Sequence, residues 1–101
     1  MAKTSSIEKN NRRRRMAKKF AGKRSRLKAI AMDKTKGMEE RFAASLKLAA
    51  LPRNGAPSRI RNRCEVTGRP RAFYRKLKMS RISLRKLGNE GQIPGLTKAS
   101  W

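Results

Sequence analysis

The sequence predicts a mainly α-helical fold with extended segments, in which N-terminal helices precede a small C-terminal module like a zinc ribbon without its metal. Apolar residues recur at helical spacing over the first half of the chain. Proline, glycine and arginine then dominate residues 52–63, and the one cysteine, Cys64, begins a segment with the spacing of a metal site. We therefore expect a helical extension over residues 1–51, an arginine-rich extended linker over 52–63 and the module over 64–101.

A first helix is expected over residues 4–32. Met16, Phe20, Leu27 and Ala31 form only a thin apolar stripe along it. Most other positions are Arg, Lys, Ala or Ser, so this helix is basic around much of its circumference. Such a helix needs charge from outside the chain to be stable.

A second helix is expected over residues 37–51. Met38, Phe42 and Leu46 share one of its faces, and this spacing is typical of residues in a core or a docking surface. Thr35 is the expected N-cap, and Pro52 ends the helix.

Residues 64–101 are expected to hold a turn, a short strand and a third helix. "TGRP" predicts the turn, and "AFYRKLKM" predicts the strand or an extended piece. Ser80 can cap a helix over about 81–90 that stops at Gly91. In "IPGL", proline followed by glycine fits a type II turn.

The charge of the chain indicates a nucleic-acid partner. The chain has 29 Lys and Arg against 6 Asp and Glu in 101 residues, a net charge of +23, with 16 basic residues in 1–51 and 13 in 52–101. Specific DNA readers usually concentrate such residues on one recognition element, whereas arginines in several local structures suit an irregular RNA surface. A transit peptide would also begin with basic residues, but here they continue to the far end. No window approaches the apolar length of a membrane span.

The residue types argue against an enzyme. There is no histidine, and the one close carboxylate pair, Glu39 and Glu40, is explained by the first turn of a helix. Cys64 has no evident base to activate it as a nucleophile. We expect no catalytic site, no cofactor and no small-molecule substrate. A single cysteine also excludes an internal disulfide and fits a reducing cytosol.

Four positions have the spacing of a structural zinc site. Cys64, Thr67, Ser80 and Ser83 reproduce C-x2-C-x12-C-x2-C. Four cysteines at this spacing would strongly indicate zinc, but neutral Ser and Thr hydroxyls are poor zinc ligands. The residues therefore predict no bound metal, and the spacing by itself is weak support for a degenerate site.

The surrounding residues give the spacing its meaning. "LPRNGAPSRIRNRC", "TGRPRAFYRKLKMSRISLRKL" and "GQIPGLTKASW" closely resemble the bacterial small-subunit ribosomal protein family S-fourteen. The resemblance covers essentially the whole chain and is most specific over residues 51–101. A short form of this family keeps four zinc-binding cysteines and a longer form loses them; this chain looks like the longer, zinc-free form.

The resemblance implies a location and partners. The protein would be cytoplasmic, in the head of the 30S subunit of a bacterial ribosome. There it would bind 16S ribosomal RNA, assist assembly and help set the RNA conformation near the aminoacyl-tRNA site (A site). The implied neighbours are small-subunit ribosomal proteins three, ten and nineteen.

We expect basic side chains from both halves to contact the RNA, with the terminal tryptophan as an anchor. Phe73 and Tyr74 can add stacking, and one of the two is expected to face inward because strand residues alternate. The helical group is Arg12, Arg13, Arg14, Arg15, Lys18, Lys19, Lys23 and Arg24; the second group is Arg53, Arg59, Arg61, Arg63, Arg69, Arg71, Arg75, Arg81, Lys98 and Trp101.

A general nucleic-acid compactor, either histone-like or an RNA chaperone, would carry the same charge. It would not require two structured modules, or a Pro-Gly turn followed by a terminal tryptophan. The sequence thus favours the ribosomal interpretation over this alternative.

Overall fold

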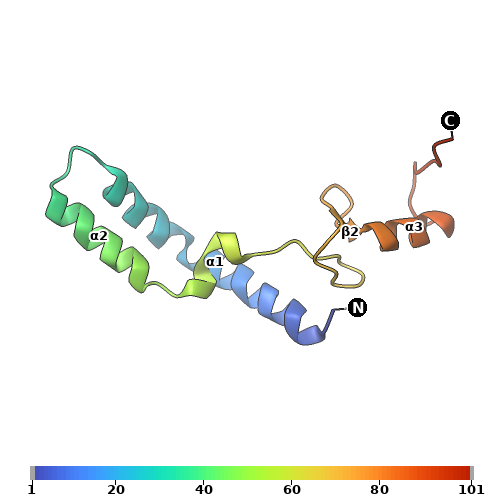
Figure 1. The fold of residues 1–101 in the computed structure, drawn as a ribbon, viewed down its shortest axis with the longest axis horizontal. Coiled ribbons are helices and arrows are strands. Elements are labelled where there is room, and N and C mark those ends of the chain that lie inside the picture. Colours follow the sequence, from blue (N-terminus) through green and yellow to red (C-terminus); the bar gives the residue numbers. More distant parts are fainter. Residues whose placement is uncertain (1, 101) are drawn as a thin grey trace. The chain divides into compact units, whose positions relative to one another are not determined.

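The computed structural model describes residues 2–100. Its elements are α1 (Thr4–Met32), α2 (Met38–Ala50), two 3-10 turns, η1 (Arg53–Gly55) and η2 (Pro57–Arg59), then β1 (Phe73–Tyr74), β2 (Met79–Ser80) and α3 (Arg81–Asn89). Figure 1 labels α1, α2, β2 and α3. The strands pair antiparallel, with Phe73 opposite Ser80 and Tyr74 opposite Met79. The predicted mainly helical fold with extended segments is confirmed. No helix within residues 2–100 is long and apolar enough to cross a bilayer.

Contacts within the chain divide it into two compact units. One unit comprises residues 8–60, and the other comprises residues 2–7 together with 61–100. The segment predicted as an extended linker over 52–63 is only partly extended, because η1 and η2 occupy residues 53–59. Pro57 at the first position of η2 favours this tight turn, since proline fixes φ near the helical value. The division at residues 51 and 63 remains a proposal about folding units.

In the unit 8–60, α1 is followed by a chain that returns antiparallel alongside it (Figure 1). Arg41 Nε donates to Ala31 O at 3.1 Å near the turn, and Arg24 Nη2 donates to Pro52 O at 3.1 Å further along. Gly55 is buried beside Phe20, and a Cβ there would lie 3.2 Å from Phe20 Cδ2. A side chain at this position would therefore require Phe20 to shift.

The core of this unit is small. Ala17, Ala44 and Leu51 are its buried hydrophobic residues among those the structure describes. The core interpretation of Met38, Phe42 and Leu46 is wrong, because these three side chains are exposed, whereas Ala44 of the same helix is buried. Ala44 lies on a different side of α2 from Met38, Phe42 and Leu46, so the buried side of this helix carries a small residue and the larger apolar residues stay exposed.

The start of α2 also differs from expectation. Its N-cap is Gly37, which has no capping side chain, and not Thr35. The Thr35 hydroxyl donates to Asp33 Oδ1 at 2.7 Å and the Thr35 backbone N–H donates to the same oxygen at 3.0 Å. Thr35 forms this local turn instead of capping α2, because an Asp side chain readily accepts a hydrogen bond from the backbone N–H two residues further on.

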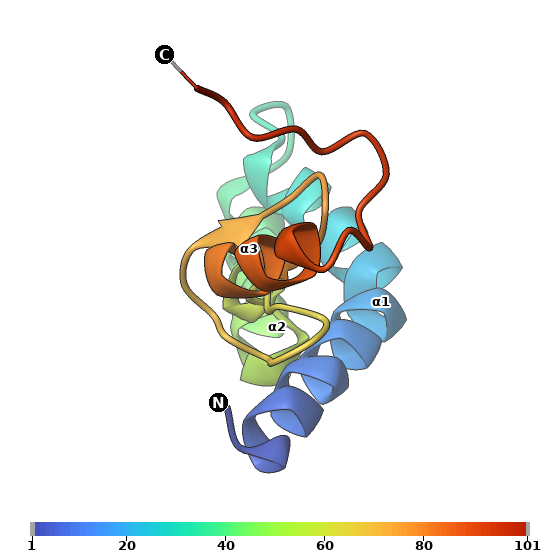
Figure 2. The ribbon, with the colours of Figure 1, turned by 90° about the vertical axis from the view of Figure 1, so that its right-hand side faces the viewer.

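The unit formed by residues 2–7 and 61–100 contains the hairpin and α3. Ala2 N donates to Thr67 O at 3.4 Å. Two features favour glycine at position 68: its φ of +78° lies in the left-handed region, and a Cβ there would crowd the Ile7 side chain. Figure 2 shows the C-terminal segment turning back past α3. Gly95, with φ of +76°, makes that turn and supports the type II geometry predicted for "IPGL".

The small cores lead to a prediction about the free protein. At low ionic strength without a polyanion, we expect far-ultraviolet circular dichroism to show much less helix than α1 to α3 contain, because net charge of +23 opposes compaction. Adding polyphosphate, which is transparent in this range, should restore the helical signal. A fully helical, cooperatively melting chain in the absence of polyanion would contradict the prediction.

Candidate nucleic-acid interface

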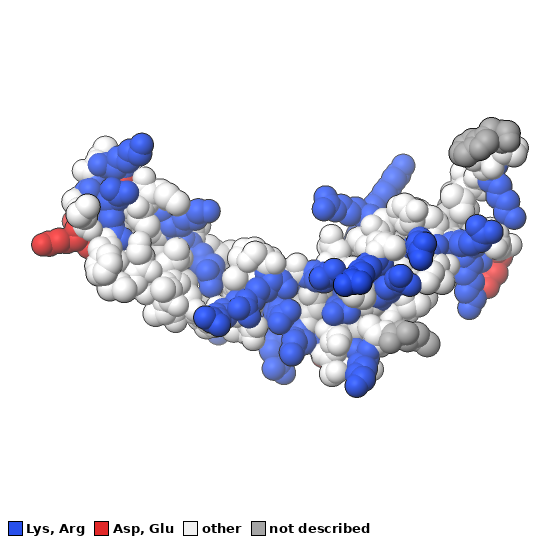
Figure 3. Space-filling view, in the orientation of Figure 1, with Lys and Arg blue, Asp and Glu red and all other residues white. Residues whose placement is uncertain are grey.

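Basic side chains cover both units, as the blue atoms in Figure 3 show. The four arginines of the Arg12–Arg15 run cannot all face one surface, because successive residues of a helix point about 100° apart. Arg13 is half-buried, whereas Arg12, Arg14 and Arg15 are exposed. Three more predicted residues of α1 are exposed, Lys18, Lys19 and Lys23. Each side of α1 away from its partner segment therefore offers cations.

Three of the predicted arginines that are half-buried also bond within the protein. Arg13 Nη1 donates to Arg59 O at 3.5 Å, Arg24 Nη2 to Pro52 O, and Arg63 Nη1 to Gly68 O at 2.9 Å. The Nε atoms of these three side chains are buried without a hydrogen-bond partner. Since a guanidinium has five N–H donors, the outer donors can still reach RNA while one donor holds a loop. Arg69 is half-buried as well.

The second predicted group is otherwise exposed. It includes Arg53, Arg59, Arg61, Arg71, Arg75, Arg81 and Lys98. Trp101 lies outside the described residues. Of the aromatic pair on β1, Phe73 is the more buried residue and Tyr74 is exposed, so the expected alternation is confirmed.

A groove of about 1060 Å³ lies between α3 and the C-terminal segment. Tyr74, Ile82 and Leu96 supply its apolar surface. Its cationic residues are Arg81, Arg85, Lys86 and Lys98. Sequence reasoning missed Arg85 and Lys86; the spacing of Arg81 and Arg85, four residues apart on a helix, was the signal that could have found one of them.

The four positions with zinc-site spacing converge in the structure. Cys64 and Ser83 are almost fully buried and Ser80 is completely buried. Cys64 Sγ lies 3.4 Å from Ser83 Oγ, and Ser80 Oγ lies 3.2 Å from Ser83 Oγ. The β1–β2 hairpin brings Ser80 to Cys64, because Glu65 N donates to Lys78 O at 3.1 Å just before β2.

The hydrogen bonds in this cluster have a consistent direction. Ser83 N donates to Ser80 Oγ at 3.3 Å, which caps α3 as the sequence predicted. The Ser80 hydroxyl donates to Ser83 Oγ. The Ser83 hydroxyl then has its own proton left to donate to Cys64 Sγ, so that each hydroxyl accepts one bond and donates one.

This arrangement favours a thiolate at Cys64. Burial by itself raises the pKa of the thiol. Hydrogen bonds from the Ser83 and Thr67 side chains, with those from the Thr67 and Ser80 backbones, outweigh burial and lower the pKa from 9.0 to about 5. The cluster thus places a negative charge at the centre of four hydrogen-bond donors.

The donor set does not fit a zinc ion. Structural zinc is held by four thiolate or imidazole ligands, and here three of the four positions carry neutral hydroxyls. The hydroxyls point at one another and at the sulfur instead. Among residues 2–100, no group of three or more His, Cys, Asp or Glu side chains is placed to bind a metal. Hydrogen bonds therefore connect the two loops that a metal would otherwise connect.

Comparisons with known proteins identify the family. Residues 47–100 match the family described as ribosomal protein S14p/S29e. The chain is 74% identical to "Small ribosomal subunit protein uS14" of Mesorhizobium japonicum and 73% identical to that of Chelativorans sp., in each case over all 101 residues of both chains. The chain belongs to the ribosomal protein S14p/S29e family.

Membership in the S14p/S29e family confirms the resemblance seen in the sequence. The family and the relatives also show that this chain is a bacterial uS14-type ribosomal protein, which is a structural constituent of the ribosome and not an enzyme. The family match covers the groove and the cluster of Cys64, Thr67, Ser80 and Ser83, here called the thiol–hydroxyl cluster. It begins only near the end of α2. The relatives extend the similarity over α1 and the rest of α2.

The cluster of this S14p/S29e family member makes a testable prediction. We expect the carbon-13 resonance of the Cys64 Cβ, measured with polyphosphate present to hold the fold, to titrate near pH 5, and near 9 in urea. Ser83→Ala should raise the midpoint, while Ser45→Ala, an exposed serine on α2, should leave it unchanged. The same midpoint in folded and unfolded protein would contradict the cluster's role.

The sign of the stability effect follows from this pKa. Because the pKa is lower in the folded state, the thiolate stabilises that state. The contribution is complete above about pH 9, decreases as the pH falls, and is lost below about pH 5.

Proposed function

We propose that this protein is a structural component of the head of the 30S subunit, in the cytoplasmic ribosome, where it binds 16S ribosomal RNA and assists assembly. The observation that carries the proposal is the excess of 29 basic over 6 acidic residues around cores of only a few apolar side chains. RNA supplies the counter-charge that the chain lacks. Family membership supports the ribosome as the particle.

Two kinds of contact follow from the geometry. The exposed cations of α1 and of the segment 53–75 pair with phosphates, because arginine and lysine on several elements can follow an irregular backbone. The groove beside α3 accepts an unpaired base, since Tyr74 offers an exposed ring next to Arg81 and Lys98. The phosphate contacts supply affinity, and the groove selects an RNA site with an unstacked base.

The finer location is part of the same proposal. The RNA contacts would lie near the A site, and the neighbouring proteins would be small-subunit ribosomal proteins three, ten and nineteen. An iron chelate tethered at Ser58→Cys should cleave 16S RNA near the A site. Ser58 is exposed, whereas the native Cys64 is buried and should not take up the chelate. Cleavage confined to other regions of the RNA would contradict this location.

Charge-removing variants test the phosphate contacts. Replacing Arg71 and Arg75 by Gln should weaken binding to 16S RNA in a filter assay. It should also reduce the slope of log affinity against log salt by about 0.7–0.9 for each phosphate that the protein no longer neutralises. Replacing Lys34 and Lys36, exposed residues outside the proposed set, makes the same change in net charge. Equal losses of affinity for the two pairs would mean that net charge alone determines binding.

A separate variant tests the base contact. Tyr74→Ala should cost about 1–3 kcal/mol of binding free energy, the usual value of one stacked base. The salt dependence should stay unchanged, because no charge is removed. Unchanged affinity, or a changed salt slope, would place Tyr74 outside the RNA interface.

A further inference from the structure

One face of α2 is apolar, whereas the surface of the protein is otherwise rich in cations. Met38, Phe42 and Leu46 lie at successive turns and are 83%, 65% and 57% exposed. With Ala49, also exposed, they form a continuous apolar stripe, here called the α2 face. Burying such large side chains is favourable, so three of them aligned in solvent mark an interaction surface rather than scattered surface residues.

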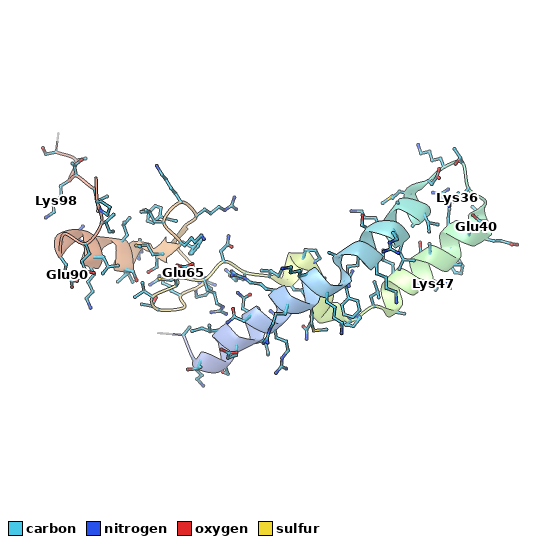
Figure 4. All side chains as sticks on the ribbon, turned by 180° about the vertical axis from the view of Figure 1, so that it is seen from behind. Lys36, Glu40, Lys47, Glu65, Glu90 and Lys98 are labelled. Carbon is cyan, nitrogen blue, oxygen red and sulfur yellow. The ribbon has the colours of Figure 1, made fainter. Side chains whose placement is uncertain are left out.

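The charges around the α2 face are equally unusual. At about 100° per residue, the arc from Ser45 through the apolar stripe to Glu39 contains no cation. The two cations of α2 lie elsewhere: Arg41 bonds to Ala31 O, and Lys47 is on the side of Glu40. Figure 4 shows Glu40 and Lys47 along α2 and Lys36 in the loop before it. In a chain with 29 basic residues, this arc offers one anion and no cation.

These properties select the kind of partner. An RNA backbone would bring phosphates to Glu39 and find no cation to pair with. A second copy of this chain would bring together two molecules of net charge +23. A different protein with an apolar surface satisfies both constraints, because it can cover the stripe and place a cation opposite Glu39.

We infer that the α2 face docks on a neighbouring protein of the small subunit, at an apolar patch that carries a Lys or Arg opposite Glu39. This inference rests on the proposed location in the 30S subunit. In the unit 8–60, α1 then binds RNA through its cations, and α2 binds protein through its apolar face. Phe42, the largest of the three side chains, is the central anchor.

A matched pair of charge reversals tests the partner's chemistry. Glu39→Lys and Glu40→Lys each change the charge by the same amount, in the same first turn of α2, at exposed positions. Only Glu39 borders the α2 face. In 30S subunits reconstituted from 16S RNA and small-subunit proteins lacking this chain, Glu39→Lys should reduce incorporation at least about tenfold, and Glu40→Lys should leave it within about twofold. Affinity for naked 16S RNA should be the same for both.

A second experiment identifies what covers the face. A photo-crosslinker at position 42 should form adducts with one small-subunit protein in the reconstituted particle. Phe42→Ser with Leu46→Ser should lower incorporation but not affinity for naked RNA, whereas Val66→Ser, at a position 61% exposed in the other unit, should do neither. Adducts with RNA or with a second copy, the absence of adducts, or equal effects of the two charge reversals would overturn the inference. If the wild-type chain fails to enter 30S subunits, the proposed function fails instead.

Discussion

Mutual repulsion among the positive charges is the constraint on which the rest of the structure depends. A net charge of +23 on 101 residues opposes any compact state. The buried hydrophobic residues in the described part of the chain, Ala17, Ala44, Leu51 and Cys64, are mostly small, so burial contributes little against that repulsion. The protein instead spreads its cations over a long helix and several turns, where a polyanion can approach each of them. We therefore expect folding and RNA binding to be coupled, because both depend on the same neutralisation.

The thiol–hydroxyl cluster shows how a small module keeps its geometry without metal. A zinc ion connects four ligands through bonds that no hydrogen bond equals in strength. Here Ser80 and Ser83 remain buried and are satisfied by each other, by the α3 backbone and by Cys64. The thiolate gives the hydroxyls one strong acceptor, since charge-assisted hydrogen bonds exceed neutral ones. The two loops stay together although each connection is weaker, and contacts with RNA can supply the remaining stability.

The helix pair of the unit 8–60 separates two kinds of surface. Arg13, Arg24 and Arg41 each donate to a backbone carbonyl elsewhere in the unit, whereas the exposed cations of α1 can bind RNA. The α2 face avoids cations altogether. In the proposed arrangement the two kinds of surface lie on adjacent helices, so that RNA and a neighbouring protein can bind the unit 8–60 at the same time.

The sequence by itself determined the three helices of this protein and the chemistry of its partner. Residues 4–32, the helix before Pro52 and the Ser80 cap were predictable because helical periodicity, proline and capping serines act within a few residues. Only the tertiary structure decided which side of α2 is buried: Ala44 is buried, whereas the row of Met38, Phe42 and Leu46 is exposed although it has helical spacing. It also decided that Arg13, Arg24 and Arg63 hold loops, and that Ser83 completes a chain of hydrogen bonds to Cys64. These outcomes depend on residues distant in the sequence meeting in space, which local patterns do not encode.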